Sequence, residues 1–364
     1  AIGSSILRDL GKWSADQLGT ARIKVLVVSN PTVFGLYGKT AVQSLSQAGF
    51  EASEFLIGDG ERFKTLKTFS AILEEFSRLQ FKRTDVVIAL GGGVVGDVAG
   101  FAAATHLRGI RFLQVPTTLL AMIDSSVGGK TGINSKYGKN LIGAFHQPSG
   151  VLIDTAVLKT LTQRELTAGF CEAVKQGALG GKKLFDATSR VIDDSVSARL
   201  FADQPSESRL VAMIAEQVKF KAGIVRDDER EEAAKNDPRS RKILNFGHTL
   251  GHALEKVTNY RYFKHGEAVG HGMMFAVGLS KKLELIGQDE VNLFNAVVRR
   301  TGDLPSLDGI DPLAVLDAFK HDKKNIADSL QWILLRGIGK PVIVSDREIP
   351  QKILSSSIRE FLSK

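Results

Sequence analysis

Histidines gather in one short part of the chain, and their spacing fits metal binding. Four of the seven histidines lie between residues 248 and 271, and His248 and His252 stand four residues apart in a segment with helical spacing. Residues at positions i and i+4 share a helical face, which is a common way for one helix to offer two metal ligands. A pair of core histidines is the alternative. We favour a metal site, with His265 close behind in the sequence.

An acidic residue is the expected partner of such histidines, and Glu172 is the candidate. It lies in the middle of a helical segment with mostly apolar neighbours, where an unpaired carboxylate would be costly. Three nitrogen and oxygen ligands with one open position are typical of a catalytic rather than a structural zinc ion. Lys175 follows Glu172 by one helical turn, and we expect it to have a functional role as well.

A glycine-rich turn is the second motif that suggests ligand binding. Residues 91–97, Gly-Gly-Gly-Val-Val-Gly-Asp, follow an apolar strand and precede a helix. In that context glycines let the backbone lie against a pyrophosphate at a helix N-terminus. The spacing is not the usual dinucleotide fingerprint, so a plain tight turn is the alternative. Asp97 would repel a phosphate, and we expect it to hold a hydroxyl or amide group of a ligand.

Polar residues of functional type also crowd the stretch from residue 124 to residue 143. A hydrophobic core requires none of them, and they stand among glycines that let a ligand approach the backbone. We therefore expect residues 86–147 to organise a ligand site. The polar residues in question are Asp124, Lys130, Asn134, Lys139 and Asn140.

Strands and helices alternate in the first half of the chain, and these elements must position the motifs. An apolar run predicts a buried parallel strand at 23–28, and further strands are predicted at 51–57, 85–90 and 110–115. The alternation continues to about residue 154 and predicts a mostly parallel sheet with helices on both faces. Such a sheet binds ligands outside the carboxyl ends of its strands.

Beyond residue 160 the apolar spacing becomes helical. We expect an α/β domain over residues 1–160 and an all-α domain over residues 161–364, with one short hairpin where residues 331–335 and 341–344 flank a glycine turn. Residues 227–242 form a charged, solvated loop. Helices are predicted at 163–180, 184–197, 206–226, 244–258, 265–285, 288–301 and 311–320.

Composition limits the class of protein. The 364 residues are too many for one ordinary core, and no apolar run reaches the roughly 18 residues of a membrane span. The net charge of +8 is spread along the chain, so a small anionic substrate explains it better than nucleic acid. A single cysteine, Cys171, excludes an intramolecular disulfide and fits a reducing compartment. We expect a cytoplasmic protein, or a plastid one if a transit peptide preceded Ala1.

Taken together, the motifs resemble the 3-dehydroquinate synthase family. The family fold, shared with glycerol dehydrogenase and iron-type alcohol dehydrogenases, joins an N-terminal nucleotide-binding α/β domain to a helical C-terminal domain. That agrees with the division reached above. The likeness covers nearly the whole chain and is carried by Asp59-Gly60-Glu61 with Lys64, residues 91–97, Arg108-Gly109, residues 116–120, 124–134 and 139–145, Glu172 to Lys175, Asn245 to His252, and His265-Gly266-Glu267.

The resemblance implies a metal site and an NAD site. Its zinc ligands would be Glu172, His248 and His265, in place of the His248–His252 pair that spacing suggests, and His252 would face the substrate. Co²⁺ could take the place of Zn²⁺. NAD would be held by Asp59, Glu61, Lys64, Gly93, Val94, Val95, Gly96, Asp97, Thr117, Thr118, Lys130, Lys139 and Thr160.

The resemblance also implies a sugar-phosphate substrate and a homodimer. The substrate phosphate would be gripped by Lys130, Asn140, Asn245 and His252, with Arg108 reaching in from the partner subunit. Its carboxylate would be bound by Lys221 and Arg241. The reacting hydroxyls would lie near Asp124 and Lys175, and Lys323 would close the site.

The implied reaction converts 3-deoxy-D-arabino-heptulosonate 7-phosphate to 3-dehydroquinate and phosphate. It joins a transient oxidation by bound NAD, a β-elimination of phosphate, a reduction and an intramolecular aldol step. Another sugar phosphate cyclase and a zinc-dependent polyol dehydrogenase are the alternatives among enzymes, and an NAD-binding regulatory protein is the alternative outside them. Residues 232–240 resemble an insertion before Arg241.

Overall fold

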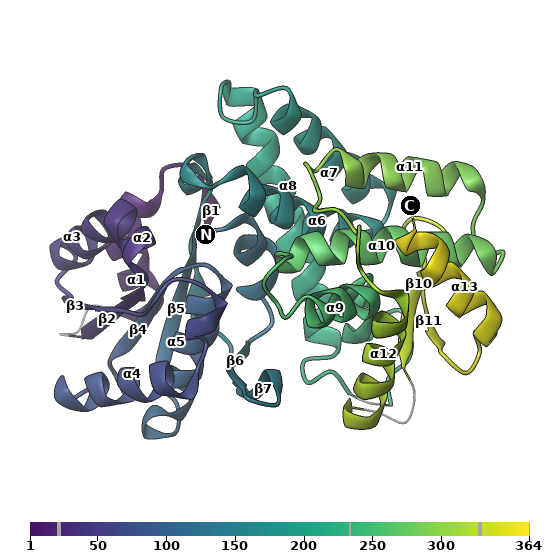
Figure 1. The fold of residues 1–364 in the computed structure, drawn as a ribbon. Coiled ribbons are helices and arrows are strands. Elements are labelled where there is room, and N and C mark those ends of the chain that lie inside the picture. The colour runs from purple at the N-terminus through teal and green to yellow at the C-terminus, as the bar shows by residue number, and fades with distance from the viewer. Residues whose placement is uncertain (20–22, 233, 327–329, 364) are drawn as a thin grey trace. The chain divides into compact units, whose positions relative to one another are not determined.

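The computed structural model describes residues 1–19, 23–232, 234–326 and 330–363, and for residues 320–326 the backbone alone. The chain divides into two compact units, Ala1–Leu161 and Thr162–Lys364 (Figure 1). Of the helices in these residues, none combines the length and the apolar character that crossing a membrane requires.

A five-stranded parallel sheet forms the centre of the first unit, as the sequence predicts. Its central strand, β4, is buried at every position because helices cover both faces of the sheet. Strand order is β3-β2-β4-β5-β8, with bounds β2 Lys24–Ser29, β3 Glu51–Leu56, β4 Val86–Gly91, β5 Arg111–Pro116 and β8 Gly150–Val151.

Alternate residues of the strands point to opposite faces of the sheet and pack into two separate hydrophobic cores. On β2, Leu26 and Val28 pack with helices α4 (Leu66–Arg78) and α5 (Gly93–Thr105). Val25 and Val27 point to the other face and pack with the helices α1 (Leu10–Leu18) and α3 (Lys39–Gln47). Because β2 is buried on both faces, its sequence is a nearly continuous apolar run.

The predicted alternation of strand and helix is wrong between residues 117 and 145. This stretch forms a π-helix at Ala121–Ser125 and an antiparallel hairpin of β6 (Lys130–Ser135) and β7 (Gly138–Phe145). Gly132 and Gly143 are opposite each other in the hairpin, and a Cβ on Gly143 would lie 2.1 Å from the carbonyl oxygen of Thr131. Polar and glycine residues placed for close backbone approach carry no apolar period, so sequence periodicity could not reveal this hairpin.

Short elements complete the first unit. Strand β1 (Ile2–Gly3) pairs in parallel with β9 (Ile153–Asp154), so the two ends of this unit meet. The remaining elements are 3₁₀ turns at Leu7–Asp9, Glu61–Phe63, His106–Arg108 and Thr155–Thr160, the helix α2 (Pro31–Val33) and a π-helix at Phe34–Gly38.

The second unit is helical around one buried helix, α6. From Leu166 to Leu179 every residue of α6 is buried, and the helix packs against α7, α8 and α10. The unit's helices are α6 Gln163–Gly180, α7 Lys182–Val196, α8 Gln204–Asp227, α9 His248–Val257, α10 His265–Lys282, α11 Gln288–Arg299, α12 Pro312–Ile326 and α13 Gln351–Leu362, with a 3₁₀ turn at Arg241–Asn245.

The expectation of an all-α second domain needs one correction. An antiparallel hairpin of β10 (Gln331–Leu335) and β11 (Pro341–Ser345) interrupts the helices, at the place where the sequence predicts a hairpin. The last helix, α13, was not expected.

Glycines bring α9 and α10 close together, which matters because these helices carry the histidines. A Cβ built on Gly272 of α10 would lie 1.9 Å from the carbonyl oxygen of Gly247, just before α9. Only glycine fits there, because neither backbone can move without shifting its helix.

We therefore expect Gly272→Ala to lower the free energy of unfolding by about 1–3 kcal/mol, the usual cost of overpacking. Gly278→Ala is the matched control on the same helix, because a Cβ there meets nothing within 4 Å. That change should be neutral or raise stability by about 0.5–1 kcal/mol, the ordinary gain of Gly→Ala inside a helix. Urea unfolding of both variants measures the difference; equal stabilities would contradict the close contact.

Candidate functional site

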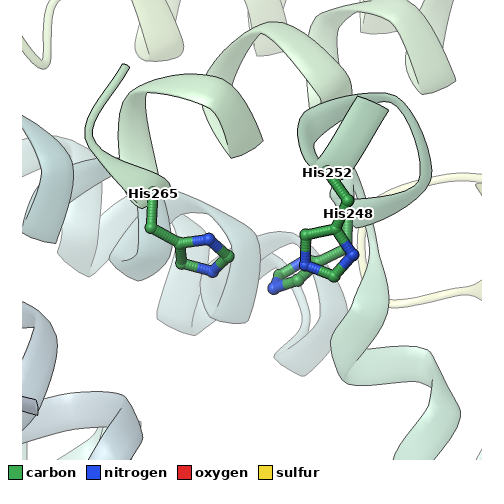
Figure 2. Close-up of side chains that lie close together, drawn as sticks. All are labelled: His248, His252 and His265. Carbon is green, nitrogen blue, oxygen red and sulfur yellow. The ribbon is translucent and has the colours of Figure 1, made fainter. Parts of the chain in front are cut away.

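The three histidines predicted from the sequence converge in the second unit. His248 is the first residue of α9, His252 lies one turn further along, and His265 is the first residue of α10. One ring nitrogen from each lies within 4.8 Å of the others. Figure 2 shows the ring of His265 reaching from one helix toward the two rings that come from the other. Three imidazoles on two helices can surround a single cation.

Glu172 also belongs to this cluster, and it comes from α6, which precedes α9 and α10 in the sequence. Its carboxylate is fully buried, and Oε1 lies 3.6 Å from Nε2 of His265 and 3.9 Å from Nε2 of His248. Lys175 Nζ lies 2.5 Å from Oε2 and is equally buried. Oε1 accepts no hydrogen bond from the described residues. A buried oxygen turned toward two imidazoles is suited to a positive ion, since it otherwise loses its hydration without replacement.

In both His248 and His265 the ring nitrogen Nδ1 has a polar contact of its own. Nδ1 of His248 lies 3.2 Å from the carbonyl oxygen of Phe246, and Nδ1 of His265 lies 3.2 Å from Oε2 of Glu255. Each contact is satisfied when Nδ1 carries the proton, which leaves the lone pair on Nε2. In both cases Nε2 is the atom near Glu172.

The two histidines differ in their proton affinity. Burial, followed by the positive charge of Lys175, holds the pKa of His248 well below its usual value. Burial also acts to lower the pKa of His265, but the hydrogen bond and charge of Glu255, with Glu172, raise it overall. His248 is therefore neutral at neutral pH, as a metal ligand must be.

The start of α10 is fixed by an ion pair that the sequence did not reveal. Arg164 near the start of α6 binds both oxygens of Glu267, with Nε–Oε1 at 2.6 Å and Nη2–Oε2 at 2.8 Å. Glu267 also accepts the backbone N–H of Lys264 at 2.7 Å. A bidentate pair of this kind adds geometric precision, and here it holds the turn of helix that begins with His265.

Cys171 has a packing role beside Glu172. Its thiol is buried and lies 3.4 Å from the hydroxyl of Thr301. Burial raises the pKa of this thiol to about 12, so it stays protonated and unreactive at neutral pH.

In the first unit the glycine-rich turn has the form of a phosphate cradle. Gly92 caps the N-terminus of α5, and a Cβ there would come within 3.2 Å of Cγ2 of Thr118. The N–H groups of the first turn of α5 point out of the helix end, where they favour an anion. Thr117 Oγ1 is buried beside this turn and has no hydrogen-bond partner within the described chain. A cradle and an unsatisfied hydroxyl together fit a nucleotide.

Lys64 explains why a carboxylate can stand behind that cradle. Its buried Nζ binds both Asp97 and the side-chain oxygen of Asn140, so the charge of Asp97 is balanced. The side chain of Asn134 donates to Glu61 at 2.7 Å and accepts the backbone N–H of Asn140 at 2.9 Å. The loop 59–64, helix α5 and strand β7 are thus tied into one polar network, which joins predicted nucleotide and substrate residues.

Other predicted residues of the first unit lie on separate elements. Asp59 accepts the hydroxyl of Thr32 at 2.9 Å, and Thr160 lies 2.5 Å from the hydroxyl of Tyr37. Asp124 belongs to the π-helix, Lys130 begins β6, and Lys139 lies on β7.

Arg108 is exposed at the end of a strained turn. Leu107, Arg108 and Gly109 have φ values of 48°, 65° and 117°, so two residues that are not glycine adopt the left-handed region in succession. Such strain persists where the surrounding structure over-determines it, and it marks functional loops.

The predicted carboxylate-binding residues, Lys221 and Arg241, are both buried. Asp228 accepts the backbone N–H of Arg241 at 2.8 Å, and Nη1 of Arg241 donates to the carbonyl of Glu229 at 2.8 Å. These bonds join the first described residues of the charged loop, at the end of α8, to Arg241 where the loop ends.

Two further residues predicted to bind the substrate, Asn245 and Lys323, lie on other elements of the second unit. Asn245 is exposed, and its amide donates to Glu231 at 3.3 Å. Lys323 lies on α12, and its side chain falls outside the described residues.

Comparison with known proteins identifies the family. The N-terminal model of 3-dehydroquinate synthase matches residues 54–168, and the C-terminal model matches residues 169–325. A 3-dehydroquinate synthase from Nostoc sp. (strain PCC 7120) is 43% identical over 359 residues, which cover 96% of this chain and 94% of that protein.

Two solved structures share the fold at 26% identity. One is 2-epi-5-epi-valiolone synthase from Streptomyces hygroscopicus subsp. jinggangensis 5008 with NAD⁺ and Zn²⁺ bound, with a TM-score of 0.87 over 100% of this chain and 96% of that one. The other is 2-deoxy-scyllo-inosose synthase complexed with carbaglucose-6-phosphate, NAD⁺ and Co²⁺, with a TM-score of 0.83 over 99% and 96%. The resemblance inferred from the sequence is confirmed: this chain belongs to the 3-dehydroquinate synthase family.

Proposed function

We propose that this chain is an enzyme that converts 3-deoxy-D-arabino-heptulosonate 7-phosphate to 3-dehydroquinate and phosphate. The observation that carries the proposal is the convergence of Glu172, His248 and His265 beside Lys175, in a chain of this family. We place the enzyme in the shikimate pathway, which leads to chorismate and the aromatic amino acids, and in the cytoplasm or a plastid.

NAD and a divalent metal are the cofactors. The metal, Zn²⁺ or Co²⁺, would be held by Glu172, His248 and His265 in the domain from residue 161 to residue 364. Glu172 is preferred to His252 as the third ligand because its buried Oε1 accepts no hydrogen bond within the described part of the chain and belongs to a carboxylate. When bound, the metal supplies a Lewis acid for a substrate hydroxyl and NAD⁺ supplies a hydride acceptor.

The domain from residue 1 to residue 160 would bind the NAD. Its cradle and the buried Thr117 hydroxyl support this assignment. The contacts we propose are those of Asp59, Glu61, Lys64, Gly93 to Asp97, Thr117, Thr118, Lys130, Lys139 and Thr160.

The chain's own side chains would bind and orient an anionic substrate. Lys221 and Arg241 are buried cations, so a substrate carboxylate would offset part of their desolvation. Lys175 is held by Glu172 and keeps its protons directed at that carboxylate, where it can stabilise negative charge that develops on a nearby oxygen. Lys130, Asn140, Asn245 and His252 would grip the phosphate, and Asp124 and Lys323 would lie near the reacting end.

A homodimer would complete the site through Arg108 of the partner subunit. The exposed strand β7 supports the proposal: it pairs with β6 on one edge, and Leu141, Ile142 and Phe145 expose 59%, 41% and 47% of their surface. Exposed apolar side chains on a strand edge are typical of a surface that another chain covers. Arg108 follows the exposed Leu107 in the strained turn.

The proposed reaction predicts stoichiometric phosphate release without net NADH. The purified protein with Zn²⁺, a catalytic amount of NAD⁺ and 3-deoxy-D-arabino-heptulosonate 7-phosphate should release one phosphate per substrate, because the cofactor is restored in each turnover. Phosphate assay and NADH absorbance measure the two quantities. Lasting NADH on simple polyols, with no phosphate released, would instead favour the polyol dehydrogenase.

The proposed ligand set predicts different outcomes at two neighbouring histidines. His248→Ala should abolish zinc retention and turnover, whereas His252→Ala should retain zinc and lose affinity for the substrate. Metal content by mass spectrometry and KM separate the two effects, and circular dichroism checks the fold. If His252→Ala loses zinc as completely as His248→Ala, the ligands are the three histidines instead.

The proposed carboxylate site predicts an effect on substrate affinity. Arg241→Ala should raise KM about tenfold or more, since a hydrogen bond to a charged group contributes about 1.5–3 kcal/mol. Arg239→Ala is the matched control, because that side chain is exposed in the same loop. An unchanged KM in Arg241→Ala would place this arginine outside the site.

A further inference from the structure

Glu255 is a buried carboxylate at the metal cluster that none of the sequence motifs brought forward. It lies on α9, three residues after His252, and is 3% exposed. Its Oε2 lies 3.2 Å from Nδ1 of His265. Helix α9 thus approaches the cluster twice, with His248 at its first residue and with Glu255 two turns later.

The backbone that carries the Glu255 side chain is held by hydrogen bonds at the end of α9. Its carbonyl oxygen accepts the N–H of Tyr260 at 2.7 Å and the hydroxyl of Thr258 at 3.2 Å. These bonds close the C-terminal end of α9 just before the chain turns toward His265. The backbone that carries this carboxylate therefore belongs to the same turn that leads to His265.

The contact sets which nitrogen of His265 can bind a cation. A carboxylate accepts hydrogen bonds and cannot donate them, so Nδ1 must carry the proton in this contact. In the neutral ring the lone pair is then on Nε2, the atom that lies 3.6 Å from Oε1 of Glu172. His248 has the same arrangement with a neutral partner, the backbone carbonyl of Phe246.

We propose that Glu255 is a positioning residue for the metal site: it fixes the ring orientation and tautomer of His265 so that Nε2 faces the ion. This inference rests on the proposed role of His265 as a metal ligand. Carboxylates behind metal-bound histidines raise the donor strength of the ring and are worth about 10–100-fold in metal affinity.

The charge of Glu255 is a second way in which this residue would favour metal binding. Lys175 lies 2.5 Å from Glu172 and offsets its negative charge. Glu255 adds a further buried negative charge at the cluster, which favours a divalent cation over an empty site. Its hydrogen bond and its charge can be separated by substitution, because glutamine keeps an oxygen that can accept from Nδ1 but has no charge.

The test is zinc affinity of the full chain, measured by competition with a chromophoric chelator. We expect Glu255→Ala to weaken binding about 10–100-fold and Glu255→Gln to weaken it less. The absorption spectrum of the Co²⁺-loaded protein should change in Glu255→Ala, because the ring of His265 is no longer held. Asp194→Asn is the matched control: it removes a buried carboxylate that binds Arg209 on α8.

The outcomes separate this inference from the proposed function. Unchanged zinc affinity and Co²⁺ spectrum in a folded Glu255→Ala would overturn the positioning role. If that variant fails to fold, the same result in Glu255→Leu, which has no acceptor for Nδ1, would do so. Weakened binding in Asp194→Asn of equal size would also overturn it, since the effect would then be general destabilisation. Absence of zinc binding by the unaltered chain would instead refute the proposed metal site.

Discussion

The burial of the Glu172 carboxylate in α6 is the constraint on which the second unit depends. A charged group without water requires compensation, and here Lys175 supplies it on one oxygen while His248 and His265 approach the other. To meet this carboxylate, α9 and α10 must both begin beside the middle of α6. Glycines at the crossings of these helices permit that approach, as the 1.9 Å between a Cβ on Gly272 and the Gly247 carbonyl shows.

The fold followed from the sequence where burial was regular. The inner strands β2 and β4 of the parallel sheet are buried on both faces, so a continuous apolar run such as residues 86–90 identifies them. The 121–145 stretch gave no such signal, because its backbone is shaped by glycines and polar contacts rather than by an apolar face. Its chemistry was visible from residue types, but its hairpin was not.

The candidate metal site was predictable only in part. His248 and His252 share a helix, so spacing alone joined them. Glu172 and His265 come from other helices; residue types made them candidates, and the family resemblance implied the ligand set Glu172, His248 and His265 in place of the His248–His252 pair. Sequence periodicity did not reveal two further contacts. Glu255 meets His265 where one helix ends and the next begins, and Arg164 meets Glu267 from a helix far away in the sequence.

The shared ammonium group of Lys64 has a consequence for ligand binding in the first unit. One positive charge serves both Asp97, on the glycine-rich helix, and Asn140, on the hairpin. An anion that draws Lys64 toward either element changes the electrostatic environment of the other. If both elements bind ligands, occupancy at one and affinity at the other are coupled equally in both directions. The contacts of Lys64 thus link the glycine-rich helix and the hairpin electrostatically.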